Sequence, residues 1–317
     1  MAELTLGDLG EHAVIERIVA VAPSSRNGDD AAILGQAAPN SRTVVTTDML
    51  IENRHFRTEW STPEEIGQRA ILQNFADIEA MGARPIAAVL AIAAPPSTPI
   101  SFIEGLARGV EQRVEYYNAE LVGGDLTSGD MVVISVTAIG SLGGSAPALE
   151  LHRAKPGQTV IAAGSIGYSG AGLALLKAMP RSDVPSSLSP LIDAFVAPTL
   201  NPGRGMIARA TGATAMTDNS DGLVFDLSTI ATRSKVSIDL DPNTIAPDAL
   251  LLEAGELLGI DPWDWILGGG EDHTLLGTTA FDVPSGFRAV GHVVKPGTHP
   301  VTLGGEPPRT TSGWVSF

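Results

Sequence analysis

The chain has 317 residues, no cysteine and a formal net charge of −16 at pH 7. The negative charge argues against nucleic-acid binding, which requires a basic surface, and the lack of cysteine excludes disulfides, thiolate metal sites and cysteine nucleophiles. The N-terminus is acidic where a signal peptide would be basic, and the longest apolar run (86–94) is too short for a bilayer, so we expect a soluble, uncleaved protein. The lack of cysteine fits a reducing compartment, so we expect it in the cytoplasm.

The first half of the chain alternates helical and strand-like segments. Apolar periodicity predicts helices over 11–21, 62–81 and 101–117, strands over 31–34, 43–47, 87–94 and 131–139, and a short strand leading into the GGD sequence at 123–125. These alternating elements favour a mixed α/β fold.

The helix over 62–81 has the clearest start signal. Thr62 as N-cap, Pro63 as first helical residue and Glu65 three positions after Thr62 form a capping-box pattern. At 100° per residue, Asn74 and Asp77 lie together on one flank of the apolar stripe of this helix. We therefore expect Asp77 to point along an edge of the domain.

A stretch rich in Gly, Ser, Ala and Pro over 140–149 predicts a domain boundary near residue 148. Beyond it the pattern predicts a new strand after 152–158, helices over 167–179 and 202–210, a strand over 214–217 and a helix that begins in SDGLVFDL with Ser220 as its cap. The 44% apolar content is enough for one or two cores, and the length exceeds that of a usual single domain. We therefore expect two α/β (α+β) domains, 1–148 and 149–317.

Four short aspartate motifs indicate divalent metal binding: GDDAA (28–32), TTDM (46–49), GGD (123–125) and NSDGL (219–223). We expect them at turns and strand ends, where aspartate is also common for structural reasons. Mg²⁺ prefers oxygen ligands and is usually held by one or two carboxylates plus substrate phosphates. NSDGL is the strongest signal because a helix N-terminus attracts anions, although helix capping explains Ser220 and Asp221 equally well.

Several common nucleotide signatures are absent from the sequence. It contains no GxxxxGK[ST] loop, no GxGxxG sequence that opens a helix and no kinase HRD set. If ATP binds, its phosphates must be held mainly through metal ions, which would also reconcile an acidic site with an anionic nucleotide. The residues therefore favour a metal-dependent phosphoryl-transfer enzyme.

The ordered motifs resemble those of thiamine-monophosphate kinases, from the superfamily that includes aminoimidazole-ribonucleotide synthetase. The matching segments are GDDAAIL, TTDMLIENRHF, QNFADIEAMGARP, VGGDLTSGD, MTDNSDGLVFDL, LGGGEDHTLL and the terminal GW. The resemblance covers nearly the whole chain. It implies an N-terminal metal- and ATP-binding domain whose sheet pairs with its twin in a homodimer, and a C-terminal α/β domain that completes the active-site cleft.

The resemblance also implies roles for individual residues. The implied Mg²⁺ ligands are Asp30, Thr46, Thr47, Asp48, Asp77, Asp125, Asp218 and Asp221, of which Asp48, Asp77, Asp125 and Asp218 are the implied catalytic residues. The implied ATP contacts are Gly124, Asp125, Arg153 and Ser220. The implied substrate contacts are His55, Glu271 and Trp314, the last by stacking on thiamine.

Two positions depart from the family pattern. Leu151 stands where family members usually carry an arginine near the phosphates, so Arg153 is the nearest arginine that can take its place. The chain ends in GWVSF where the family commonly ends in GWDHF or GYDHF, so the surroundings of Trp314 differ.

The implied reaction is direct in-line transfer of the ATP γ-phosphoryl group to thiamine monophosphate, assisted by several Mg²⁺ ions and without a covalent phosphoenzyme. One alternative is a sister enzyme that uses ATP to activate an amide-type substrate, and another is a non-catalytic nucleotide or thiamine-phosphate binder. His55, Glu271 and Trp314 favour thiamine over the sister substrates, and the complete acidic set argues against a mere binder. Relatives in selenium or hydrogenase maturation usually need a reactive cysteine or selenocysteine, whereas this chain has no cysteine.

Overall fold

The computed structural model describes residues 4–9, 11–23, 39–310 and 313. The chain forms two compact units, Met1–Ile78 with Arg84–Ser145 and Glu79–Ala83 with Ala146–Phe317. No helix among the described residues is both long enough and apolar enough to cross a membrane.

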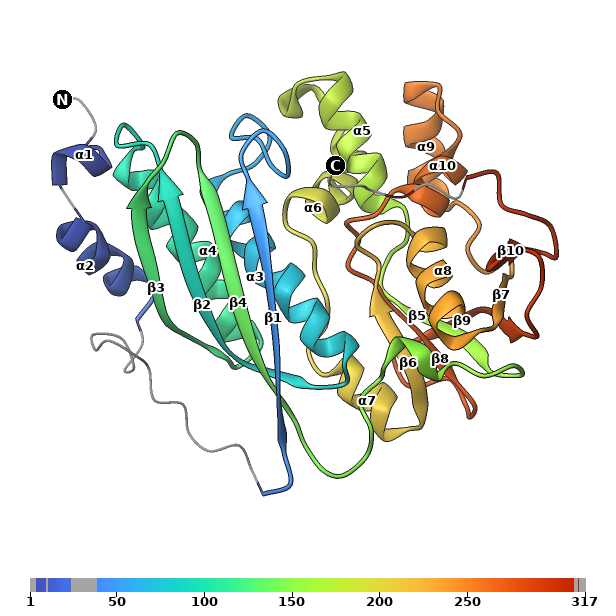
Figure 1. Ribbon diagram of the computed structural model, residues 1–317. Helices are drawn as coiled ribbons and strands as arrows, with labels where there is room; N and C mark the ends of the chain where they lie inside the picture. Colours follow the sequence, from blue (N-terminus) through green and yellow to red (C-terminus); the bar gives the residue numbers. More distant parts are fainter. Residues whose placement is uncertain (1–3, 10, 24–38, 311–312, 314–317) are drawn as a thin grey trace. The chain divides into compact units, whose positions relative to one another are not determined.

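The first unit is built on a four-stranded sheet in the order β1-β4-β2-β3 (Figure 1). Its strands are β1 (Arg42–Ile51), β2 (Arg84–Ala94), β3 (Glu120–Ser128) and β4 (Val133–Leu142). β4 pairs antiparallel with both β1 and β2, and β3 pairs parallel with β2. The two edge strands, β1 and β3, therefore run in the same direction.

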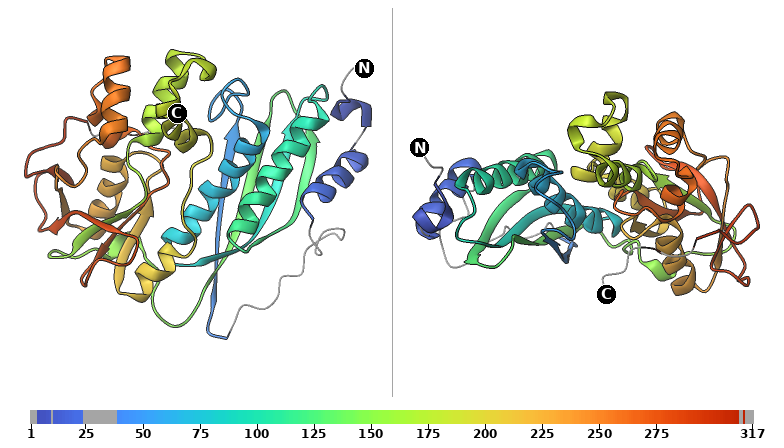
Figure 2. Two further views of the ribbon diagram at one scale, coloured as in Figure 1. Left: turned by 180° about the vertical axis from the view of Figure 1, so that it is seen from behind. Right: turned by 90° about the horizontal axis from the view of Figure 1, so that it is seen from above.

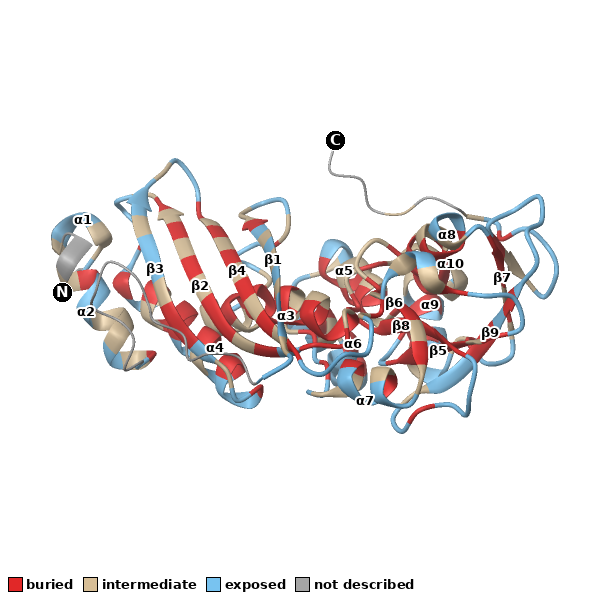
Figure 3. Cartoon of the chain, turned by 60° about the horizontal axis from the view of Figure 1, so that its bottom comes forward, coloured by how far each residue is buried: buried red, intermediate tan, exposed pale blue. Residues whose placement is uncertain are grey.

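Helices cover one face of this sheet. Figure 2 shows α3 (Pro63–Ala80) and α4 (Ile100–Tyr116) against the sheet, with α1 (Leu6–Leu9) and α2 (Glu11–Val21) beside α4 and β3. Along β4, buried and half-buried residues alternate, as expected when one face of a strand packs against helices (Figure 3). The opposite face carries Val45 and Met49 of β1 with 61% and 49% of their surface exposed.

Two glycines let α3 and α4 approach each other closely. A Cβ atom on Gly67 would lie 2.2 Å from the carbonyl oxygen of Leu106, and one on Gly109 would lie 2.0 Å from that of Glu64. Both obstacles are backbone atoms and cannot turn aside as a side chain can. The close contact between these helices therefore requires glycine at both positions.

The second unit contains a six-stranded sheet in the order β10-β7-β9-β5-β8-β6. Its strands are β5 (Thr159–Ala163), β6 (Ala213–Asp218), β7 (Ser237–Leu240), β8 (Leu275–Thr279), β9 (Arg288–Val294) and β10 (Val301–Leu303). Its helices are α5 (Tyr168–Ala178), α6 (Ser189–Val196), α7 (Arg204–Ala210), α8 (Leu223–Ser234), α9 (Ala249–Leu258) and α10 (Pro262–Gly268). α8 packs against β6 and β7, and α5 packs against α6, α9 and α10.

The structure confirms the mixed α/β fold and most of the predicted elements. The capping box at the start of α3 is formed as predicted: the Thr62 amide donates to Glu65 Oε2 at 2.8 Å, and the Glu65 amide donates to Thr62 Oγ1 at 3.3 Å. The strand predicted over 31–34 lies outside the described residues.

Three local predictions were wrong. TTDM does not end its strand, and GGD is not a loop after one, because backbone pairing continues through both motifs to Ile51 in β1 and to Ser128 in β3. Ser220 is not the cap of α8, since the helix begins at Leu223 with Gly222 as N-cap. The Ser220 carbonyl instead accepts a hydrogen bond from the Glu271 amide, so this residue continues a strand-like pairing.

We expect Gly109→Ala to lower the free energy of unfolding by about 1–3 kcal/mol, the usual range for overpacking, although alanine is the better helix former by about 1 kcal/mol. Chemical denaturation measures this difference. Ser101→Ala, at an exposed position of the same helix, is the control and should be neutral or slightly stabilising. A stabilised Gly109→Ala variant would contradict the close helix contact.

Candidate functional site

One group of site residues in the first unit lies between β1 and α3. Thr46 Oγ1 donates to Asp77 Oδ2 at 2.6 Å, and the Asp48 amide donates to Asn74 Oδ1 at 3.0 Å. Side chains alternate along a strand, so Thr46 and Asp48 face the helix together, and Asn74 and Asp77 lie on the matching flank of α3. Asn74 is buried and also donates to the Ala70 carbonyl at 3.0 Å, which fixes its orientation.

Thr47 and Asp125 lie on the other face of the same sheet. Thr47 is paired with Thr137, whose hydroxyl donates to Thr47 Oγ1 at 3.1 Å. Asp125 is exposed and pairs in register with Ala91, on the face opposite to the buried Leu90. The described ligands of the first unit therefore lie on both faces of the sheet instead of in one cluster, with Thr47 on edge strand β1 and Asp125 on the opposite edge strand β3.

Gly124 precedes Asp125 in β3 and faces the helices. A Cβ atom at this position would lie 2.0 Å from the carbonyl oxygen of Leu90, so the strand tolerates only glycine here. The glycine expected to contact ATP thus also has a purely structural reason to be glycine.

His55 follows β1 in a tight turn. The Ile51 amide donates to His55 Nδ1 at 3.0 Å, and the His55 amide donates back to the Ile51 carbonyl at 2.9 Å. Since Nδ1 accepts a hydrogen bond, the neutral ring carries its proton on Nε2. His55 is therefore half-buried in one fixed orientation that presents an N–H group.

In the second unit, two loops continue the pairing of β6 with β8. The Asn219 amide donates to the Thr274 carbonyl at 2.8 Å, the His273 amide to the Asn219 carbonyl at 3.0 Å, and the Glu271 amide to the Ser220 carbonyl at 2.8 Å. This pairing brings residues from 218–221 and 271–273, far apart in sequence, into one place. The structure thereby groups four predicted site residues: Asp218, Ser220, Asp221 and Glu271.

The backbone of the loop before β8 adopts unusual conformations. Glu271 has φ of 59° and His273 has φ of 50°, in the left-handed region that residues other than glycine rarely adopt. Such residues cluster at functional sites, where the surrounding structure must hold them in place. Here the paired loops supply that support.

His273 was not predicted as a site residue, although it lies within the GGGEDH motif. It is buried, with Nδ1 2.8 Å from Asp218 Oδ2 and Nε2 3.7 Å from Glu271 Oε2. Burial alone would lower the pKa of His273, but the hydrogen bonds and charges of Asp218 and Glu271 outweigh it and raise that pKa to about 10. His273 therefore lies between two carboxylates that favour the protonated form of its ring.

Asp226 was also missed by sequence reasoning. Its Oδ2 accepts hydrogen bonds from the amides of Asp221 at 3.2 Å and Gly222 at 3.1 Å. Asp226 lies in the first turn of α8, so its side chain bonds to backbone N–H groups at the start of its own helix. Burial, and then the charges of Asp218 and Asp221, raise the pKa of Asp226 to about 8. An acidic residue in the first turn of a helix was the available signal.

Asp272 ties this loop to α5. Its carboxylate accepts hydrogen bonds from the amides of Gly167 at 2.6 Å and Ser169 at 2.8 Å, and from the side chain of Asn219 at 3.3 Å. Burial raises the pKa of Asp272 to about 7. Asp272 therefore fixes the loop that carries Glu271 and His273 to the start of α5.

The structure says less about the other three predicted site residues, Arg153, Asp30 and Trp314. Arg153 ends the 3₁₀ turn Leu151–Arg153, and its guanidinium lies 3.8 Å from a carboxylate oxygen of Glu150. Asp30 and Trp314 lie outside the described residues.

The donor set fits Mg²⁺ in its chemistry. Burial, and then the negative charges of Asp218 and Glu271, raise the pKa of Asp221, which shows that carboxylates crowd here and that a cation would stabilise them. No three His, Asp or Glu residues in the described part of the chain are grouped so that they could hold a metal ion by themselves. Mg²⁺ usually takes few protein carboxylates and completes its shell with water and phosphate oxygens.

Comparison with known proteins places this arrangement in a family. Residues 28–142 match the N-terminal domain of the AIR synthase related protein. Thiamine-monophosphate kinase from Corynebacterium glutamicum is 63% identical over 314 residues, covering 99% of this chain and 95% of that protein. The enzyme of the same name from Mycobacterium tuberculosis H37Rv is 43% identical over 319 residues, covering 99% and 93%.

A solved structure agrees over the whole length. AaThiL complexed with AMPPCP and TMP matches with a TM-score of 0.80 and 29% identity, and the match covers 100% of both chains. Since identity to a curated relative reaches 63% over nearly the full length, this chain belongs to the thiamine-monophosphate kinase family.

Proposed function

We propose that this chain transfers the γ-phosphoryl group of ATP to thiamine monophosphate, giving thiamine diphosphate and ADP. The observation that carries the proposal is the 63% identity, over 99% of the chain, to a thiamine-monophosphate kinase. The structural match to AaThiL with an ATP analogue and TMP supports both substrates.

The proposed Mg²⁺ ligands are Asp30, Thr46, Thr47, Asp48, Asp77 and Asp125 of the first unit and Asp218 and Asp221 of the second. Bound Mg²⁺ would neutralise the phosphate oxygens of ATP and of the acceptor. The other protein residues would hold these ligands in place. Asn74 fixes the backbone at Asp48, and Thr46 holds the carboxylate of Asp77. We also propose Gly124, Ser220 and Arg153 as ATP contacts.

The acceptor needs no protein base. A phosphate monoester has a second pKa of about 6, so its attacking oxygen is already mostly deprotonated at neutral pH. The remaining task is to bring two anions together in line, which is a matter of positioning and charge neutralisation. We therefore propose direct transfer without a covalent phosphoenzyme.

For the thiamine end of the substrate we propose His55, Glu271 and Trp314. The fixed Nε2–H group of His55 can donate a hydrogen bond, and the Glu271 carboxylate can accept one or face the positive charge of thiamine. A sister enzyme with an amide-type substrate would have no use for such a cation-binding carboxylate. The family assignment favours the kinase over both the sister enzyme and a non-catalytic binder.

We further propose a homodimer that works in the cytoplasm. The open face of the first unit's sheet supports the dimer, because the exposed Val45 and Met49 are apolar side chains of the kind that a subunit contact covers. The lack of cysteine fits a reducing compartment.

The proposed activity is tested by ADP release from ATP and Mg²⁺ with thiamine monophosphate, with unphosphorylated thiamine, and without acceptor. We expect ADP and thiamine diphosphate in equal amounts with the monophosphate alone, with the diphosphate identified by chromatography. Tight ATP binding with no ADP release would instead support the binder, and ADP release that needs another acceptor would support the sister enzyme.

Replacing Asp48 or Asp77 by Asn removes the negative charge of a proposed Mg²⁺ ligand. The size of the side chain and one hydrogen-bond acceptor are kept. We expect turnover to fall about a hundredfold or more, while the free energy of unfolding changes by about 1 kcal/mol or less. Steady-state kinetics and denaturant melts measure the two effects. Asp282→Asn, at an exposed position, is the matched control; unfolding of both site variants would refute the assignment.

His273→Phe keeps the volume of the ring but removes the N–H group that orients Asp218. Since partners of metal ligands commonly contribute 10- to 100-fold in affinity, we expect Mg²⁺–nucleotide to bind at least about tenfold more weakly. Titration calorimetry with a non-hydrolysable ATP analogue measures this affinity. His292→Phe, at an exposed position of β9, should leave it unchanged; equal affinity in both variants would remove His273 from the site.

A further inference from the structure

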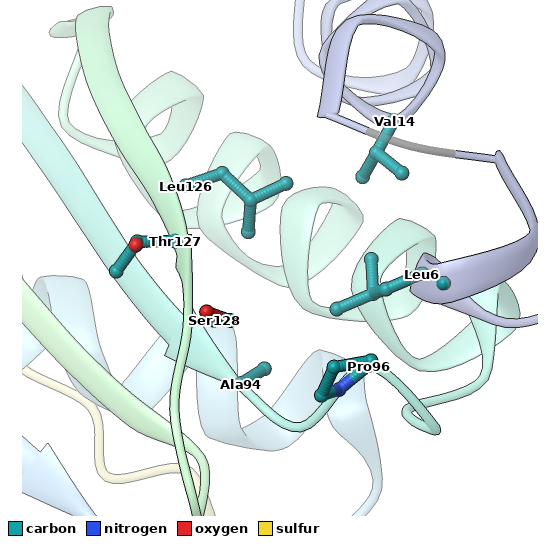
Figure 4. Close-up of a pocket in the computed structure, with 8 residues that line it drawn as sticks. Leu6, Val14, Ala94, Pro96, Leu126, Thr127 and Ser128 are labelled. Carbon is teal, nitrogen blue, oxygen red and sulfur yellow. The ribbon is translucent and has the colours of Figure 1, made fainter.

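Two pockets formed by the described residues differ in their chemistry. The pocket of the first unit has a volume of about 340 Å³, and the side chains of Leu6, Val14 and Leu126 point toward one another in it (Figure 4). None of the described residues that line it is charged. The pocket of the second unit has a volume of about 280 Å³ and is lined by a guanidinium group and a carboxylate, those of Arg288 and Asp248. Of the two, the second pocket therefore offers the charges that select a polar ligand.

The pocket of the second unit lies at the ends of three neighbouring strands. Gly164 and Ser165 follow β5, residues 244–246 follow β7, and Arg288 begins β9. β9 lies between β7 and β5 and is antiparallel to both, so these positions meet at one end of the sheet. Arg288 on β9 and Asp218 on β6 are three strand spacings of about 4.8 Å apart, which is about 14 Å. The pocket is therefore separate from the carboxylates of the candidate site.

Arg288 has hydrogen-bond donors that the protein does not use. Its Nη1 donates to the Gly164 carbonyl at 2.6 Å, which holds the side chain against the pocket wall. No carboxylate of a described residue forms an ion pair with Arg288, although the chain carries a net charge of −16. A guanidinium has five N–H donors in a planar fork that matches two oxygens of a phosphate or a carboxylate. The remaining donors are therefore available to an oxyanion.

Asp248 is bound by other groups and does not neutralise this guanidinium. Its Oδ1 accepts hydrogen bonds from the amides of Leu250 and Leu251 at 3.1 Å each, as the N-cap of α9. Its Oδ2 accepts a hydrogen bond from the hydroxyl of Tyr168. Burial, and then the hydrogen bond and the charge of Asp248, raise the pKa of Tyr168 to about 12, so this hydroxyl keeps the proton that it donates. Three donors thus stabilise Asp248 without Arg288.

Two buried residues of the pocket wall add further donors. Ile166 and Ile245 are 6% and 5% exposed, and their backbone N–H groups donate no hydrogen bond within the described part of the chain. Buried backbone N–H groups are nearly always paired, either with protein atoms or with ordered water. An oxygen-bearing ligand in the pocket is a further kind of acceptor for such groups.

We propose that this pocket binds the phosphate or carboxylate group of a small metabolite, with Arg288 as the residue that pairs with its oxygens, and that the bound ligand stabilises the loop of the candidate site. Phosphate and carboxylate share the geometry that a guanidinium recognises. None of the residues that line the pocket belongs to the proposed metal, ATP or thiamine contacts. The ligand is therefore additional to the substrates of the proposed reaction.

Hydrogen bonds join the pocket wall to that loop. Thr274 Oγ1 donates to the carbonyl of Ser165, and the Asp272 carboxylate accepts from the amides at the start of α5. Thr274 and Asp272 are the two neighbours of His273 in the chain, and Glu271 precedes them. A ligand that holds the segment after β5 in place thus also holds the loop. Because binding at two coupled sites is reciprocal, the anion and the ligands of the candidate site would strengthen each other's binding.

The first test is titration calorimetry of the metal-free full-length chain with inorganic phosphate and, separately, with acetate. Without a metal ion the crowded carboxylates of the candidate site repel anions, so the heat reports the pocket. We expect at least one of the two anions to bind at one site per chain with a Kd of about 1 mM or tighter. The anion that binds more tightly identifies the ligand group as phosphate or carboxylate. Binding of neither would overturn the proposal.

Arg288→Gln removes the charge and most of the donors, and we expect anion binding at least about tenfold weaker. The matched control is Arg233→Gln, at an exposed position in the last turn of α8, which should bind the anion as wild type does. Equal affinity in all three proteins would show an adventitious ion only and would overturn the proposal. Since Arg288 is itself exposed, we expect the variant to fold, and its melting curve checks this.

Ser165→Glu is a second variant that does not depend on the loss of Arg288. It places a carboxylate in the wall of the pocket at an exposed position, so we expect repulsion of the anion and loss of binding. Undiminished binding in a folded Ser165→Glu chain would contradict the placement of the ligand in this pocket.

Hydrogen exchange tests the link to the candidate site. With saturating anion we expect slower exchange of the amides of Glu271 and His273 in wild type and no change in Arg288→Gln. Anion binding without slower exchange in this loop would overturn the link. These measurements contain neither ATP nor thiamine monophosphate, so their outcome does not depend on the proposed reaction.

Discussion

The candidate site depends on keeping carboxylates close together although their charges repel. In the second unit, Asp218, Asp221 and Glu271 are near enough that the charges of Asp218 and Glu271 raise the pKa of Asp221, after burial. The mutual repulsion of these carboxylates opposes this arrangement. The fold must therefore supply the restraint that holds the acids in place before any cation arrives, and a preorganised anionic group is what a site for Mg²⁺ and phosphate requires.

Backbone pairing supplies most of that restraint. The ladder between β6 and β8 continues past the strand ends and holds Glu271 beside Ser220, with Glu271 and His273 in left-handed conformations. Three buried side chains then lock the loops: His273 binds Asp218, Asp226 binds the amides at the start of α8, and Asp272 binds those at the start of α5. In the first unit the side chain of Asn74 holds β1 by accepting a hydrogen bond from the Asp48 amide.

The sequence predicted what local chemistry determines and missed what long-range pairing determines. The capping box at Thr62 and the shared flank of Asn74 and Asp77 follow from spacing within one helix, and both were correct. TTDM and GGD were assigned to a strand end and a loop because aspartate and glycine favour turns, yet pairing with β4 and β2 extends the strands through them. The roles of Asp226, Asp272 and His273 depend on partners that only the folded chain brings near.

Strand β1 shows why the site and the open face of the first unit cannot vary independently. Its period of two sends Thr46 and Asp48 toward α3 and sends Val45, Thr47 and Met49 to the other face, so one ten-residue strand serves both surfaces. A shift of the pairing with β4 by a single residue would exchange the two sets and expose the carboxylate where the apolar side chains now lie. The register of β1 with β4 therefore determines both that Asp48 faces α3 and that Val45 and Met49 lie on the open face.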